Sequence, residues 1–308
     1  MEDCEQVLGR EYEEIDSILS GEKDASDTIA NIFQKFIEYK IQYQKTTQRT
    51  INNYKYGIYS IFGGDLNILL NEKNIKIALD NFIKNTAITG TSINNILRYV
   101  QVFLNWSSDD DNQYIANKNY IKKYKQTPQK TIRPPYTEDE YKMFVNYFAK
   151  NNAEMNYFIQ FLWNTGARSG EAINVKISDI NFKKNYIVIP NKIFKGQQET
   201  LLLTDATKEI IEKIISLKRS KNEKLFSWNS KVTPIKNLEN AEKKLNMKIR
   251  GRGFHGFRRS FADRLFESGF DMPEIQEAMR HRTINTTLEH YKSFNKTNII
   301  KKLNEKLK

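Results

Sequence analysis

Three of the six prolines lie within residues 124–136, and this cluster constrains how the rest of the chain can fold. Proline fixes its own φ angle and lacks an amide hydrogen, so Pro128, Pro134 and Pro135 disfavour a helix through this segment. Apolar residues recur at helical spacing on both sides of it. The sequence therefore predicts two separately folded, mainly helical parts joined by a linker at 124–136, which also carries three basic residues.

The helical patterns predict one domain before the linker and one after it. Residues 1–26 are acidic and too few for an independent domain, so we expect an N-terminal extension there. Residues 27–123 carry amphipathic stripes of the kind that pack into a helical core. Residues 137–308 open on Thr137 and Glu140, a pair with the spacing of a capping box, and continue mostly as helix. The stripes of the first domain cover residues 29–37, 51–62 and 93–104.

One part of the second domain has the pattern of strands. Residues 186–190 and 200–203 flank a turn that contains Lys195 and Gly196, which predicts a β-hairpin with a longer loop. The expected fold class is therefore mainly α, with a small antiparallel sheet in the C-terminal domain.

The charge balance favours a polyanionic partner. The formal net charge is +12 and the isoelectric point is about 9.4, which suits nucleic acid. Charge alone does not discriminate, because a lysine-rich solvated surface gives the same balance. Cys4 is the one cysteine, so an intramolecular disulfide is excluded. The chain shows neither a membrane-length apolar run nor a signal-peptide pattern, so we expect a soluble, cytoplasmic protein without a membrane partner.

Four separated segments contain the residues that could perform chemistry. Each has an ordinary explanation by itself: Arg168 and Glu171 at helical spacing commonly form a surface ion pair, and a lysine before a glycine is commonly part of a turn. Their combination and order favour one shared site. The segments are 164–172 with Arg168 and Glu171, 194–196 with Lys195, 253–262 with His255 and Arg258, and 279–291 with His281 and Tyr291.

This set of segments resembles the signature of the tyrosine recombinases, the phage integrase family. That signature is Thr-Gly-x-Arg-x-x-Glu, a lysine in a β-turn, His-x-x-Arg, a Gly-His pair and a tyrosine nine or ten residues later. The resemblance covers about residues 160–292, and more loosely the helical domain before them. Two positions depart from it: Arg259 stands where the family often has histidine, and Arg280 stands where it usually has glycine. Both arginines could add phosphate contacts.

The resemblance implies a fold and an activity. The first domain would be a SAM-like core-binding domain, and the second a catalytic domain with the DNA breaking-rejoining fold. The activity would be site-specific recombination, as in mobile genetic elements, through a 3′-phosphotyrosyl intermediate. The partners would be double-stranded DNA with inverted half-sites and three further copies of the chain. The chain would be a monomer in solution and a tetramer on DNA, acting through a Holliday junction.

The chemistry of DNA cleavage explains the residue types. Arginine donates paired hydrogen bonds to phosphate and stays charged, so Arg168 and Arg258 are the expected phosphate clamps. Tyr291 is the expected nucleophile, and its hydroxyl, with an ordinary pKa of about 10, needs help to lose its proton. The remaining expected roles are His255 as base or proton relay, Lys195 as general acid, His281 as a phosphate hydrogen-bond donor and Glu171 as support for the catalytic groups. Exchange of the ester requires no ATP, metal or cofactor.

Two alternatives remain beside the recombinase. One is a DNA-binding regulator with an inactive site, which the complete residue set argues against. The other is a type IB topoisomerase-like nicking and closing enzyme, which the short chain and the His281-to-Tyr291 spacing disfavour. The sequence leaves open whether the biological outcome is integration, excision or dimer resolution.

Overall fold

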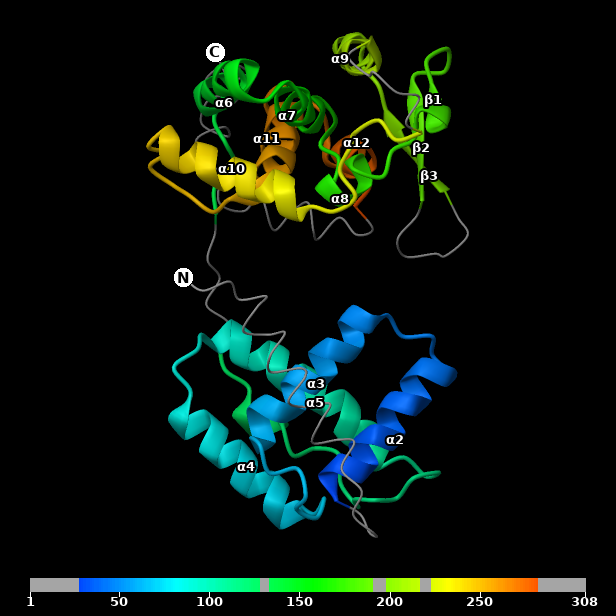
Figure 1. Cartoon of the computed structure of the whole chain (residues 1–308), viewed down its shortest axis with the longest axis vertical. Helices are drawn as coiled ribbons and strands as arrows, with labels where there is room; N and C mark the ends of the chain where they lie inside the picture. The colour runs from blue at the N-terminus through cyan, green and yellow to red at the C-terminus, as the bar shows by residue number, and fades with distance from the viewer. Residues whose placement is uncertain (1–27, 128–132, 191–197, 217–222, 282–308) are drawn as a thin grey trace, which may run out of the picture. The chain divides into compact units, whose positions relative to one another are not determined.

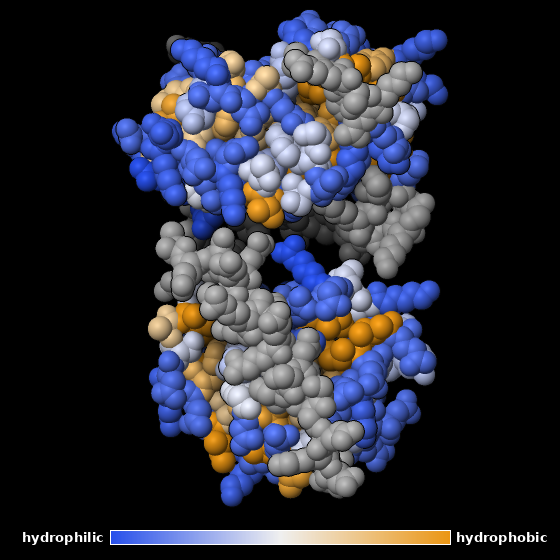
Figure 2. Space-filling view, viewed as in Figure 1, coloured by the Kyte–Doolittle hydropathy of each residue, from blue (hydrophilic) through white to orange (hydrophobic). Residues whose placement is uncertain are grey.

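A computed structural model of the chain describes residues 28–127, 133–190, 198–216 and 223–281. The chain divides into two compact units, Met1–Thr131 and Ile132–Lys308. Both units are mainly helical, and the second contains one small sheet (Figure 1). Among the coloured residues in Figure 2, hydrophilic side chains lie beside smaller hydrophobic areas on both units. In the described ranges, no helix is long and apolar enough to cross a membrane.

Four helices form the described part of the first unit. Three of them were predicted from their apolar stripes, and Gly63, with a φ of 66°, ends the second. The remaining helix, α4, was not predicted because its buried face is narrow: Ile75 and Leu79 are its fully buried residues. The elements are α2 (Ile29–Gln42), α3 (Gln48–Phe62), α4 (Glu72–Asn85), α5 (Gly90–Ser107) and the 3₁₀ turn η1 (Lys122–Tyr124).

In the second unit, helix α7 packs against α6, α8 and α9, and also against helix α11. Helix α11, orange in Figure 1, packs against α7, α10 and α12. The capping box predicted at the start of α6 is confirmed: the Thr137 hydroxyl accepts from the Glu140 amide at 3.2 Å, and the Glu140 carboxylate accepts from the Thr137 amide at 2.9 Å. The elements are α6 (Glu138–Asn151), α7 (Ala153–Thr165), α8 (Ser169–Ala172), the 3₁₀ turn η2 (Ile177–Asp179), α9 (Asp205–Ser216), α10 (Val232–Lys244), α11 (Gly253–Glu267) and α12 (Met272–Met279).

The sheet of the second unit is antiparallel, in the order β1-β2-β3. Its strands are β1 (Ile180–Asn181), β2 (Tyr186–Pro190) and β3 (Gln198–Leu202), so the predicted hairpin is confirmed. Strand β1 was not predicted, because two residues are too short for an alternating pattern. The connection between β2 and β3, which contains Lys195, lies outside the described residues.

A partly buried carboxyl on α11 makes the stability of the second unit depend on pH. Burial, with the neighbouring Glu267 adding to it and Arg259 opposing it, raises the pKa of Asp263 to about 6 from an ordinary 3.8. Between pH 4 and 6 the unfolded chain therefore loses this proton before the folded protein does. The ionised carboxylate thus lowers the stability of the fold, and this effect is complete above about pH 6.

We predict that Asp263→Asn stabilises the second unit at pH 7 by about 1–2 kcal/mol, after allowance for solvent screening of the charge. The gain relative to the unmodified chain should shrink as the pH falls and vanish below about pH 3, where the carboxyl is protonated in both states. Urea unfolding followed by tryptophan fluorescence in a Trp106→Phe background measures it, because Trp163 and Trp228 then report on the second unit. Glu212→Gln, at an exposed position of α9, is the control. A gain that does not change with pH would contradict the prediction.

Candidate active site

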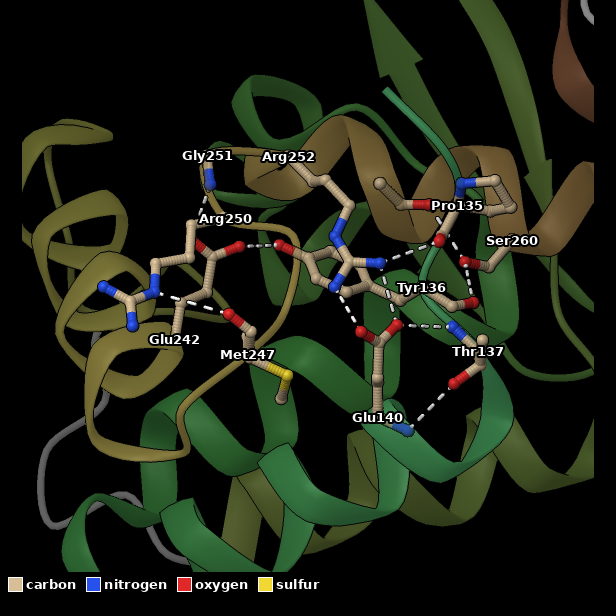
Figure 3. A network of polar contacts seen from close by, with 11 residues as sticks. Pro135, Tyr136, Thr137, Glu140, Glu242, Met247, Arg250, Gly251, Arg252 and Ser260 are labelled. Atoms are coloured by element: carbon tan, nitrogen blue, oxygen red, sulfur yellow. Dashed lines mark hydrogen bonds and ion pairs between the residues drawn. The ribbon is translucent and has the colours of Figure 1, made fainter. Parts of the chain in front are cut away.

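Helix α11 carries two of the predicted site residues, and buried polar contacts hold its beginning in place (Figure 3). Arg252, just before the helix, is 3% exposed. Its guanidinium donates to both oxygens of Glu140 at 2.8 and 2.5 Å, and to the Pro135 carbonyl at 2.9 Å. It also lies 4.0 Å from the centre of the Tyr136 ring. The start of α11 is therefore bound to the segment that leads into α6.

Tyr136 connects the same segment to helix α10. Its hydroxyl donates to the buried Glu242 carboxylate at 2.5 Å, and the second oxygen of Glu242 accepts from the Gly251 amide at 2.8 Å (Figure 3). Burial, and then the hydrogen bond to Glu242, raise the pKa of the Tyr136 hydroxyl, so it remains a donor. The Ser260 hydroxyl donates to the Tyr136 carbonyl at 2.7 Å. These contacts fix the axis of α11, which positions its functional side chains.

Arg168 and Glu171 form a paired unit at the turn between α7 and α8. The Arg168 amide donates to Glu171 Oε2 at 3.0 Å, and its Nη1 donates to Glu171 Oε1 at 2.7 Å. The Glu171 side chain is 4% exposed, whereas that of Arg168 is 32% exposed. Burial by itself would raise the pKa of Glu171, but the charge of Arg280 and the contacts with Arg168 outweigh it and lower that pKa. Glu171 is thus an ionised, buried anchor for a partly accessible guanidinium.

The Arg258 side chain extends from α11 to two backbone carbonyls outside that helix. It is 4% exposed, donates from Nη1 to the Gly166 carbonyl at 2.5 Å, and donates from Nη2 to the Met279 carbonyl. Burial, and then the charges of Arg168 and Arg280, lower its pKa to about 9. The guanidinium therefore remains charged at neutral pH and adds to an excess of positive charge.

Three sequence segments that are far apart in the chain meet at the end of α12. Arg258 binds the Met279 carbonyl, and Arg168 Nη2 lies 3.5 Å from the next carbonyl, that of Arg280. His281 follows directly, with its amide donating to Gln276 at 2.9 Å. The structure therefore brings both predicted phosphate clamps to the turn that bears the predicted hydrogen-bond donor.

His255, Lys195 and Tyr291 complete the predicted site. His255 is exposed in the first turn of α11, three residues before Arg258, so the two share one side of the helix. Lys195 and Tyr291 lie outside the described residues, so their roles remain predictions. Arg280, expected to add a phosphate contact, has its guanidinium bound to Glu171 at 2.8 Å.

Sequence reasoning did not find the supporting contacts around α11. Nothing in the pattern near Arg252 or Glu242 predicts a partner more than one hundred residues away. In the four ranges that the structure describes, no group of three or more His, Cys, Asp or Glu side chains could hold a metal ion.

The comparisons with known proteins decide the family. The sequence model of the phage integrase family matches residues 136–298, more than half of the chain, and this stretch contains every predicted site residue. The chain belongs to the phage integrase family. It is 28% identical to the tyrosine recombinase XerA of Pyrococcus furiosus over 170 residues, which are 51% of this chain and 57% of that protein. The chain spans about half the length of the curated relatives it matches first.

Solved structures of other family members share the fold. A lambda integrase dimer bound to a COC′ core site matches with a TM-score of 0.70 at 18% identity, over 96% of this chain and 88% of that one. A lambda integrase tetramer bound to a Holliday junction matches with a TM-score of 0.68 at 20% identity, over 84% and 76% of the two chains. The predicted fold class, mainly helical with a small antiparallel sheet, is confirmed for this integrase-family chain.

We predict that Gly166→Ala disrupts the Arg258 site. Gly166 has a φ of 59°, and a Cβ there would lie 2.4 Å from Phe261 Cδ1. The backbone strain and the overlap together should lower the free energy of unfolding by about 2–4 kcal/mol and displace the carbonyl that Arg258 binds. Urea unfolding of the second unit measures the loss.

Gly269→Ala is the matched control for that variant. Gly269 also has a positive φ, 91°, but among the described residues no atom beyond its own chain neighbours lies within 4 Å of the point that its added Cβ would occupy. It therefore carries the backbone strain without the steric overlap. Equal destabilisation by the two substitutions would contradict a close packing requirement at Gly166.

Proposed function

We propose that this chain is a tyrosine-type site-specific DNA recombinase, an enzyme that cleaves and rejoins duplex DNA by strand transesterification. The observation that carries the proposal is the convergence of Arg168 and Arg258 on the end of α12, next to His281. The family match extends through Tyr291 and supports the same assignment.

The charge of the site suits a phosphate that gains negative charge. Arg168, Arg258 and Arg280 surround one ionised carboxylate, Glu171, and Glu199 lies 3.8 Å from Arg280. Three guanidiniums against two carboxylates leave a net positive charge in a site where Arg258, Arg280 and Glu171 are buried. Preorganised donors of this kind act most strongly where negative charge develops in the transition state. A scissile phosphate is the group that such a site would stabilise.

The proposed reaction exchanges one phosphoester for another. The Tyr291 oxygen attacks phosphorus, the bond to the 5′ oxygen breaks, and a 3′-phosphotyrosyl bond forms. His255 takes or relays the tyrosine proton, and Lys195 donates a proton to the leaving 5′ oxygen. His281 donates to a non-bridging oxygen, while Glu171 holds Arg168. Attack by a 5′ hydroxyl on the phosphotyrosine reverses these steps, so the reaction needs no ATP, metal or cofactor.

The proposed partners are duplex DNA with inverted half-sites and further copies of this chain. The first unit would serve as the core-binding domain and the second as the catalytic domain, with residues 124–136 between them. The net charge of +12 supports DNA as the partner. The likeness to a lambda integrase tetramer on a Holliday junction supports a tetramer on DNA. Away from DNA the chain would be a monomer. The proposed location is the cytoplasm, on DNA.

We predict that Tyr291→Phe abolishes a covalent protein–DNA adduct while DNA affinity stays within about twofold, because only the nucleophilic hydroxyl is removed. The assay traps the adduct on nicked duplexes from the DNA that flanks the gene. Tyr157→Phe, in the matched region but outside the proposed site, is the control. Adduct formation by Tyr291→Phe would refute the nucleophile, and specific binding without any wild-type adduct would favour an inactive regulator.

We predict that Arg168→Ala and Arg258→Ala each slow single-turnover cleavage by about 100- to 1000-fold, as removal of one transition-state donor does. Binding of the same duplex should weaken far less, because the charge is needed most at the five-coordinate phosphorus. Cleavage rates on nicked duplexes and affinities from a gel-shift titration measure the two effects. Near-normal cleavage by either variant would contradict the assignment. Arg258→Ala also requires an unfolding measurement, since it leaves two buried carbonyls without their donor.

A further inference from the structure

Arg280 occupies a backbone conformation that glycine adopts more easily than any other residue. It ends α12 with φ 53° and ψ 49°, in the left-handed region. A side chain disfavours this region, because its Cβ crowds the backbone. An arginine at such a position indicates that its side chain contributes something that offsets the strain.

The Arg280 side chain is buried between two carboxylates from different elements. It is 6% exposed, and its Nη2 donates to Glu171 Oε2 on α8 at 2.8 Å. Its Nε lies 3.8 Å from Glu199 Oε2 on β3. The end of α12 is thereby joined to α8 and to the hairpin strand that begins three residues after Lys195.

Stability alone does not explain this arginine. The Nε and Nη1 atoms of Arg280 are buried without a hydrogen-bond partner among the described residues. Buried donors without acceptors weaken a fold, and so does the burial of a charge that is incompletely paired. A glycine here would remove these penalties and relieve the backbone, but it would also take one partner from the buried Glu171 carboxylate, so the contribution of Arg280 is to be sought in its contact with Glu171.

The contacts of Glu171 indicate what that contribution is. One oxygen of Glu171 accepts from Arg168 Nη1, and the other accepts from the Arg168 amide and from Arg280 Nη2. The backbone of Arg280 adds a further contact, since its carbonyl lies 3.5 Å from Arg168 Nη2. Arg168 is thus held on one side by Glu171 and on the other by the residue that orients Glu171.

We propose that Arg280 is a positioning residue that fixes the Glu171 carboxylate and, through it, the Arg168 guanidinium, while it ties this pair to strand β3. The inference rests on the proposed function, because it assigns Arg280 a role in the same phosphate site. It differs from a direct phosphate contact, since Arg280 acts through Glu171.

The test uses the full chain with Arg280→Gly, Glu171→Gln and the double variant. Single-turnover cleavage is measured on nicked duplexes from the DNA that flanks the gene. Arg280→Gly should slow cleavage by about 10- to 100-fold, as loss of a supporting contact typically does. Its affinity for the same duplex should stay within about threefold, and its urea midpoint should show that the variant is fully folded under the assay conditions, since Arg168 still pairs with Glu171. Arg250→Gly, which removes an exposed charge from the same unit, should cleave normally.

The double variant separates positioning from other roles. If Arg280 acts through Glu171, Arg280→Gly should slow cleavage little further once Glu171 is Gln, so the two effects are not additive. The inference would be overturned if the two substitutions slowed cleavage by factors that multiply in the double variant. It would also be overturned if Arg280→Gly weakened only DNA affinity, or if a lower urea midpoint accounted for its slower cleavage. Normal cleavage by Arg280→Gly beside an active wild type overturns this inference alone. Absence of any Tyr291-dependent adduct in the wild type overturns the proposed function together with it.

Discussion

The second unit depends on where its buried arginines find acceptors. A guanidinium taken out of water needs oxygen atoms in fixed positions, and in this fold many of them are backbone carbonyls at the ends of secondary-structure elements. Arg258 binds the carbonyls of Gly166 and Met279, and Arg252 binds that of Pro135. These carbonyls belong to segments that the chain brings together only on folding. The arginines therefore act as cross-links between the helices as well as sources of charge.

Two polar clusters lie near α11 and differ in their charge. At its beginning, the Arg252 guanidinium is paired with Glu140, and the Tyr136 hydroxyl donates to Glu242 (Figure 3). At the end of α12, three arginines lie around Glu171, with Glu199 farther away, and the positive charge is in excess. The cluster at the start of α11 stabilises the arrangement of the helices. The cluster at the end of α12 concentrates positive charge, which costs some stability because like charges repel.

Much of the local structure follows from patterns within a few residues. The capping box at Thr137, the hairpin strands and three of the four helices in the first unit were predicted because their signals are local periodicity, capping and turn chemistry. Helix α4 and strand β1 were not predicted, because their local signals are weak: α4 has a narrow apolar face, and β1 has only two residues. The site residues were recognised from sequence motifs and their order along the chain. Motifs identify which residues belong to the site, but they do not give the distances between them.

The sequence by itself determined the family, the helical class and the identity of the residues expected to do chemistry, because these depend on residue type and spacing along the chain. Only the tertiary structure decided how those residues are supported. The Arg280 guanidinium contacts Glu171, and the Tyr136 hydroxyl contacts Glu242. In each pair the two residues are more than one hundred positions apart in the sequence. Such contacts depend on how α8, α10, α11 and α12 pack, and packing is set by the whole core at once rather than by any single stretch of sequence.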